Sequence, residues 1–131
     1  MKTLKPLYIK ERLGAIGDEV ISPLVILNQI EETFEISGTS LLHGNPVEFY
    51  EPILKWLRDY LENPNKKTVF TFKMRYFDTG SSKMLLDIMN MCRDIPNIKI
   101  YWYYMKDDED TMQAGYDFAE IINQQFEFIE I

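Results

Sequence analysis

The clearest signal of the fold lies in residues 69–93, VFTFKMRYFDTGSSKMLLDIMNMCR. Apolar and polar residues alternate over Val69–Phe77, which predicts a β-strand whose apolar face carries Phe70, Phe72, Met74 and Tyr76. From about Gly80 to Arg93 the apolar spacing becomes helical, and the predicted stripe consists of Leu85, Ile88, Met89 and Cys92. Between the two lies a turn of small polar residues. The stretch therefore predicts a strand, a turn and an amphipathic helix.

The same alternation continues toward the C-terminus. Pro96 ends the helix, and Ile98–Tyr104 reads as a further strand. The acids of Asp107–Asp110 suit the positive end of a third helix. Its predicted apolar stripe is Met112, Tyr116, Ala119 and Ile122. Phe126–Ile131 closes the chain as a last strand.

Toward the N-terminus, Asn45 followed by Pro46 and Glu48 predicts a capped helix start, and Asn63–Pro64 predicts its end. Tyr50, Ile53, Leu54, Leu57 and Leu61 recur along that helix at helical spacing. Before it we expect an edge strand at Leu7–Ile9 and a loop at Leu13–Ser22. A hairpin follows, with strands at Leu24–Leu27 and Thr33–Ser37 around the turn Asn28–Glu32, and it ends at Gly38.

This order of elements predicts an α/β fold. We expect one domain over residues 1–131, with a mixed β-sheet covered by about three helices. A chain of 131 residues can bury a core without staples.

Composition argues against several classes of function. A single cysteine rules out an intrachain disulfide, and we see neither a signal peptide nor a run of about 20 apolar residues, so we expect a cytoplasmic protein without membrane insertion. The net charge of −7 arises in the last 26 residues, where one lysine faces eight acids. Nucleic acid binding needs a basic face, so we do not expect it. A solvated acidic helix is the favoured interpretation of that charge, and a basic protein partner is the alternative.

No set of residues predicts catalysis, a metal site or a cofactor. His43 is expected on the surface and Cys92 in the core. The two residues are too far apart in sequence to suggest a zinc site. Asp107–Asp110 lacks the spacing of a calcium loop. Tyr101–Tyr104 places aromatic residues on both faces of a strand, and we expect the second face to pack under a helix.

The remaining motif is YFDTGSSK, residues 76–83, at the corner between strand and helix. Thr79 or Asp78 is expected to cap the helix, and Thr79, Ser81 and Ser82 bring hydroxyls to its positive end. A phosphoryl group there would be stabilised by the dipole and by backbone N–H groups. The physical alternative is a well-capped helix start without further function.

At this motif the sequence resembles the SiaC family of bacterial regulatory phosphoproteins, whose fold is STAS-like, that is, similar to anti-sigma-factor antagonists. The resemblance spans most of the chain and is carried by LYIKE (7–11), FEISG (34–38), NPVEFYEPILKWL (45–57), YFDTGSSK (76–83) and WYY with DDEDTMQAG (102–104 and 107–115).

The family pattern at the corner is close to Tyr-x-Asn-Thr-Ser-Ser-x-Lys, and Tyr76, Thr79, Ser81 and Lys83 match it. Asp78 stands where the family has Asn, which puts a negative charge beside the acceptor. Gly80 stands where it has Ser, which removes a hydroxyl and loosens the helix start.

The resemblance implies a non-catalytic partner-switching module. Thr79 is then the phosphorylated residue, and Tyr76, Asp78, Gly80, Ser81, Ser82 and Lys83 form the recognition surface around it. The implied partners are a protein kinase, a PP2C-type phosphatase and a target protein, in characterised family members a diguanylate cyclase that acts in biofilm and aggregation signalling. Two alternatives remain open: a constitutive interaction module that uses the acidic third helix, and a domain that binds a small molecule or lipid.

Overall fold

The computed structural model describes residues 3–14 and 20–131. The described residues form six strands and three helices, which follow one another as β1 (Leu7–Ile9), β2 (Leu24–Asn28), β3 (Thr33–Ser40), α1 (Pro46–Glu62), β4 (Thr68–Phe77), α2 (Thr79–Arg93), β5 (Ile98–Tyr104), α3 (Glu109–Ile122) and β6 (Phe126–Glu130). Within the described residues, none of these helices has both the length and the apolar composition needed to span a bilayer.

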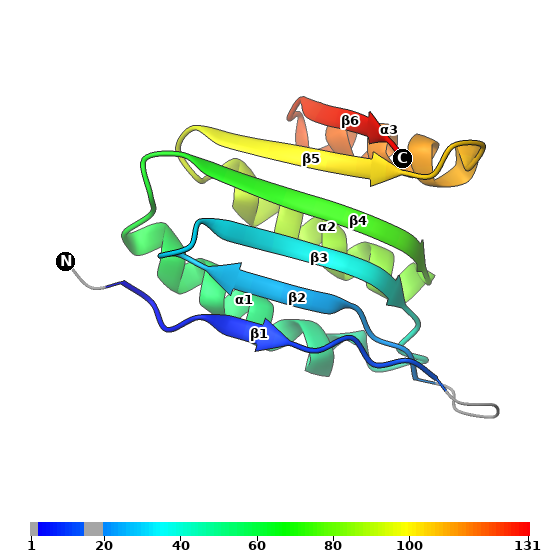
Figure 1. The fold of residues 1–131 in the computed structure, drawn as a ribbon, viewed down its shortest axis with the longest axis horizontal. Helices are drawn as coiled ribbons and strands as arrows, with labels where there is room; N and C mark the ends of the chain where they lie inside the picture. Colours follow the sequence, from blue (N-terminus) through cyan, green and yellow to red (C-terminus); the bar gives the residue numbers. More distant parts are fainter. Residues whose placement is uncertain (1–2, 15–19) are drawn as a thin grey trace.

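The strands form one sheet in the order β1-β2-β3-β4-β5-β6. β1, β2 and β3 pair antiparallel, whereas β3, β4, β5 and β6 pair parallel. All three helices lie behind the sheet in Figure 1, on the same face. The predicted α/β class, with a mixed sheet and three helices, is confirmed. Because β3 to β6 are parallel, their carboxyl ends meet at one edge, where α1, α2 and α3 begin.

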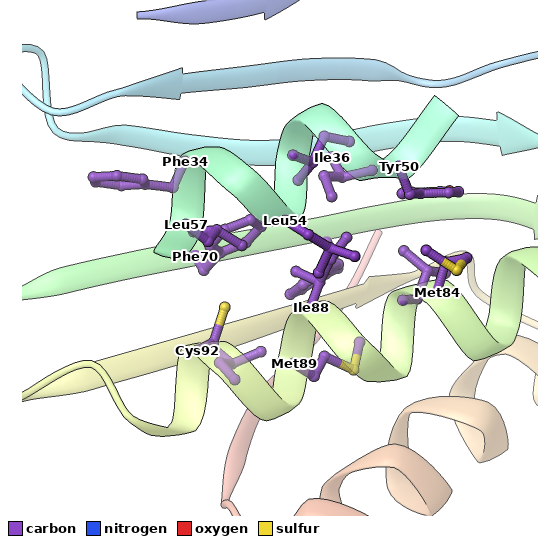
Figure 2. Close-up of a cluster of buried hydrophobic side chains, with 14 of the residues drawn as sticks. Phe34, Ile36, Tyr50, Leu54, Leu57, Phe70, Met84, Ile88, Met89 and Cys92 are labelled. Carbon is purple, nitrogen blue, oxygen red and sulfur yellow. The ribbon is translucent and has the colours of Figure 1, made fainter. Parts of the chain in front are cut away.

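The core lies between the sheet and the helices. Side chains of α1 and α2 meet those of β3 and β4 there, including Phe34, Ile36, Leu57, Phe70 and Ile88 (Figure 2). The expected stripe of α2 is confirmed, since Leu85, Ile88, Met89 and Cys92 are all fully buried. The alternative of a lipid-binding or small-molecule domain predicts a cavity in this layer, where the structure places a cluster of buried side chains.

β3 is longer than the sequence pattern predicts, because the strand does not end at Gly38. Gly38 has φ +113, and the pairing with β4 continues beyond it to Ser40. The register shifts there, from Gly38 opposite Met74 to Thr39 opposite Tyr76. One extra residue on β4 reverses the alternation of faces. Tyr76 is therefore 57% exposed rather than on the apolar face with Met74.

The face of the sheet opposite the helices is open, and the expectation that both faces of Tyr101–Tyr104 pack inside is wrong. Trp102 is fully buried, but its neighbours Tyr101 and Tyr103 lie partly exposed on the open face. The ammonium of Lys73 lies 4.7 Å from the centre of the Tyr103 ring. The cation and the ring form a half-solvated surface instead of a second core.

Helix α3 is rotated from its predicted orientation. Its buried stripe is Thr111, Gly115, Phe118 and Ile122, while Tyr116 is 47% exposed. A Cβ on Gly115 would lie only 2.4 Å from Cδ1 of Trp102, so the glycine lets the helix backbone rest on the indole. The indole N–H donates to the Thr111 carbonyl at 2.9 Å, which fixes the rotation. The closest approach of the helix, rather than its most apolar stripe, sets its orientation.

Two smaller expectations concern the cap of α1 and the loop Leu13–Ser22. Pro46 begins α1 as predicted, but Asn45 makes no side-chain cap bond, and its amide instead donates to Glu48 at 2.6 Å. The expected loop Leu13–Ser22 falls partly outside the described residues. At its described end, Ser22 forms an isolated antiparallel bridge with Arg12.

Candidate functional site

The motif predicted at residues 76–83 lies at the carboxyl edge of the parallel strands. β4 ends at Phe77, and α2 begins two residues later at Thr79. Thr79 is exposed, and its hydroxyl makes no hydrogen bond to the described residues. A helix start that faces solvent offers unpaired backbone N–H groups and a positive potential, both of which favour an added negative group.

Asp78 is the N-cap of α2. Its Oδ1 accepts from the Ser81 N–H at 2.8 Å, and its Oδ2 accepts from the Leu42 N–H at 3.1 Å. Partial burial opposes ionisation of this carboxyl, but hydrogen bonds from Ser81, Leu42 and His43 outweigh burial and lower the pKa of Asp78. Of the two predicted caps, the structure selects Asp78, and Thr79 is left as the first helical residue.

Ser81 points into the protein and is fully buried. Its hydroxyl donates to the Ser40 carbonyl at 3.0 Å and accepts from the Ser40 hydroxyl at 2.7 Å. The Ser40 hydroxyl in turn meets the Tyr50 hydroxyl at 2.7 Å. We call these three side chains the buried hydroxyl network. Placing the Ser81 side chain on the recognition surface is therefore wrong, because its hydroxyl joins α2 to β3 and α1.

The buried hydroxyl network is neutral at physiological pH. Burial raises the pKa of Tyr50 to about 12, and the nearby charge of Asp78 adds to that effect, while the hydrogen bond with Ser40 opposes it. Within the described residues no buried side-chain nitrogen or oxygen is left without a partner. The buried polar side chains beneath Thr79 thus have their hydrogen-bond partners inside the protein.

The other residues of the motif lie around Thr79 on the surface. Lys83 and Gly80 are exposed, and Ser82 is half-buried. A Cβ on Gly80 would lie 3.1 Å from Cγ of Pro46, the first residue of α1. Gly80 therefore allows the starts of α1 and α2 to approach each other. This packing role is separate from the missing serine hydroxyl noted in the sequence.

The two candidate reactive residues elsewhere lie as the sequence predicts. His43 is exposed, and Cys92 is fully buried, so burial raises the pKa of its thiol. Neither contacts Thr79 through any hydrogen bond among the described residues. Across the described ranges, no group of three His, Cys, Asp or Glu side chains is arranged to hold a metal ion.

The sequence motif did not reveal Ser40, Tyr50 or the Leu42 backbone as parts of this site. Ser40 lies 41 residues before Ser81 and Leu42 lies 36 residues before Asp78, and neither carries a local signal. For Ser81 a signal existed: residues 81, 85, 88 and 92 fall on one helical stripe, and the last three are apolar. The phase of the helix therefore indicates that Ser81 faces inward.

Comparisons with known proteins agree with this description. The family model described as "SiaC family regulatory phosphoprotein" matches residues 16–131. No match was found among curated protein sequences. The chain is also similar to apo-SiaC from Pseudomonas aeruginosa, with TM-score 0.75 and 17% identity over 97% of this chain and 98% of that chain.

A second similar structure is that of the diguanylate cyclase SiaD in complex with its activator SiaC from Pseudomonas aeruginosa, with TM-score 0.75 and 18% identity over 92% of this chain and 100% of that chain. At such identities the structural likeness establishes the fold, which is STAS-like. The family match covers most of the chain and establishes the kinship. This chain belongs to the SiaC family of regulatory phosphoproteins.

Proposed function

We propose that this chain is a non-catalytic regulatory phosphoprotein that switches partners when Thr79 is phosphorylated. A protein kinase transfers a phosphoryl group from a nucleoside triphosphate to Oγ1 of Thr79, with loss of the hydroxyl proton and release of the diphosphate. A PP2C-type phosphatase hydrolyses the ester and releases inorganic phosphate. The unmodified form binds and stimulates its target protein.

The observation that carries this proposal is the contrast between Thr79 and its surroundings. Its hydroxyl is exposed and unbonded, whereas the nearby hydroxyls of Ser40, Tyr50 and Ser81 are buried and bonded to one another. A kinase can reach the first without disturbing the others. The added charge of about −1.5 to −2 would then change the surface while the fold persists.

The proposed target is a diguanylate cyclase. The support is family membership together with the SiaC relative that is described as the activator of the diguanylate cyclase SiaD. The exposed residues of the motif, namely Tyr76, Gly80 and Lys83, are the surface that the kinase and phosphatase would recognise. Tyrosine is enriched among the residues that dominate binding energy at interfaces, which fits the exposure of Tyr76.

The first experiment is phosphosite mass spectrometry on protein isolated from its native cells, paired with pull-downs of wild type, Thr79→Ala and Thr79→Asp. We expect phosphate on Thr79, and a partner that the Ala variant retains and the Asp variant loses. Ser82→Ala is the matched control, because Ser82 lies three residues away and is half-buried. Phosphate confined to another residue, with Thr79 unmodified, would contradict the proposal.

The second candidate is a constitutive interaction module that uses α3. Its support is an exposed surface on which Tyr116 and Ile121, 47% and 62% exposed, lie among acids such as Asp117 and Glu120. On this hypothesis Ile121→Ala and Asp117→Lys abolish partner binding, and Thr79→Asp does not change it. The switch proposal predicts the reverse order of effects.

A further inference from the structure

Asp78 connects the proposed phosphoacceptor to a second segment of the surface. We propose that Asp78 is a positioning residue through which a phosphate on Thr79 releases the segment Leu42–Asn45 from α2. This inference rests on the proposed function, because it concerns how modification of Thr79 is passed on. It adds the part of the surface that the modification would change.

The carboxylate of Asp78 holds two chain segments together, an arrangement that we call the Asp78 link. One oxygen accepts from the N–H of Ser81 in α2 at 2.8 Å, and the other accepts from the N–H of Leu42 between β3 and α1 at 3.1 Å. The Asp78 N–H donates back to the Ser40 carbonyl at 3.1 Å. A single side chain thus connects the start of α2 to the connection that precedes α1.

The link needs an aspartate at this position. A carboxylate accepts hydrogen bonds at both oxygens, whereas an asparagine has one accepting oxygen and a donating amide. With asparagine at position 78, the amide would face one of the two N–H groups, and one bond would be lost.

The segment that the link holds has an unusual backbone. His43 has φ +39 and Gly44 has φ +93, so two consecutive residues adopt positive φ. A non-glycine residue in that region is strained, and the strain persists only where surrounding bonds hold it. The N–H of Leu42 bonds to Asp78, and the Leu42 carbonyl accepts from the Asn45 N–H at 3.2 Å. Loss of the first bond removes one of these constraints.

A phosphate on Thr79 acts directly against the link. It would place about two negative charges on the residue next to an ionised carboxylate, and both groups seek the N–H groups at the start of α2. Like charges at this distance repel, and the carboxylate has solvent to move into because Asp78 is only partly buried. The weaker contact is the longer one, to Leu42. As the carboxylate moves away it also loses its bond from the His43 backbone, so the exposed residues His43 and Asn45 are free to change conformation.

Amide hydrogen exchange by NMR tests this directly. The samples are wild type, Asp78→Asn, Asp78→Ser, and protein with phosphothreonine incorporated at position 79 during synthesis. We expect exchange of the Leu42 amide to quicken about tenfold or more in Asp78→Ser and in the phosphorylated protein. In Asp78→Asn either the Leu42 or the Ser81 amide should quicken. The Ile36 amide in the middle of β3 reports global unfolding, and the Leu42 amide should quicken by more than the Ile36 amide does.

Asp108→Asn is the matched control. Asp108 caps α3 in the same way, by accepting from the Thr111 N–H at 3.0 Å, and it should leave Leu42 unaffected. Unchanged Leu42 exchange on phosphorylation would overturn the proposal, as would unchanged exchange at both Leu42 and Ser81 in Asp78→Asn. Because the phosphate is installed without a kinase, the result is independent of whether cells modify Thr79. Absence of that modification would count against the proposed function alone.

Discussion

Two neighbouring serines give the sharpest test of how the site is built. Ser81 is fully buried, and its hydroxyl makes two hydrogen bonds, whereas Ser82 is half-buried and makes no side-chain hydrogen bond within the described residues. Both lie in the first turn of α2. The substitutions Ser81→Ala and Ser82→Ala remove the same atom at almost the same place in sequence, so their difference isolates the buried hydroxyl network.

The expected size of the difference follows from the bonds. In Ser81→Ala the Ser40 hydroxyl loses its acceptor at 2.7 Å, and the Ser40 carbonyl loses one donor at 3.0 Å but keeps the Asp78 N–H. A buried group left unsatisfied costs about 1–3 kcal/mol. The higher helix propensity of alanine offsets about 0.5 kcal/mol. We therefore expect Ser81→Ala to lower the free energy of unfolding by about 0.5–2.5 kcal/mol and Ser82→Ala to change it by less than about 0.5 kcal/mol.

The assay is urea unfolding followed by the fluorescence of Trp56 and Trp102, both of which are buried. Two-state fits give the midpoint and slope for each variant, and equal slopes allow the stabilities to be compared. Phosphosite mapping of the same variants should find Thr79 still modified in Ser81→Ala. Equal stability of the two variants would refute the buried hydroxyl network, and phosphate on Ser81 would refute its burial.

Three further predictions concern stability and reactivity. Gly115→Ala should lower Tm in calorimetry, because its Cβ would lie 2.4 Å from the Trp102 ring and overpacking of about 1–3 kcal/mol exceeds a propensity gain of about 1 kcal/mol; a raised Tm would disprove the contact. Because the pKa of Asp78 is lowered in the folded protein, the stability that its carboxylate contributes is present above the unfolded pKa of about 3.9 and is lost as the pH falls through the folded pKa. The difference in unfolding free energy between wild type and Asp78→Ala, measured by urea titration, should therefore close below about pH 4. The Cys92 thiol should react with a disulfide reagent roughly a thousandfold more slowly than in the unfolded chain, because reaction requires opening of the core; rapid reaction of the native protein would contradict its burial.

Much of the fold could be predicted from the sequence because its signals are local. The stripe of α2 and the order of strands and helices follow from periodicity over short windows. Pro46 marks the start of α1, and α2 ends at Arg93, as the spacing predicts. Position 78 also carried a usable signal, since an aspartate before a helix is a favoured N-cap.

The features that could not be predicted depend on contacts between distant residues. The exposure of Tyr76 results from a register shift against Gly38, and strand periodicity on β4 alone carries no trace of it. The rotation of α3 results from the approach of Gly115 to Trp102, which outweighs the apolar stripe that includes Tyr116. The buried face of Ser81 differs from these, because the phase of its own helix indicates it.

That helical phase also explains why one hydroxyl of the motif suits a switch and the other a framework. Successive residues of an α-helix are turned by about 100°, so residues two apart point in nearly opposite directions. With Ser81 fixed inward by its bonds to Ser40, Thr79 must face solvent, on the same side as Lys83 one turn later. A phosphate on Thr79 would therefore gain an oppositely charged neighbour at i+4 spacing, worth about 0.2–0.5 kcal/mol for an exposed pair. Lys83→Ala should accordingly weaken recognition of the phosphorylated form more than recognition of the unmodified form. The first is measured as the phosphatase rate on the phosphorylated protein, and the second as the affinity of the unmodified protein for its partner. An equal effect on both would show that Lys83 does not respond to the phosphate.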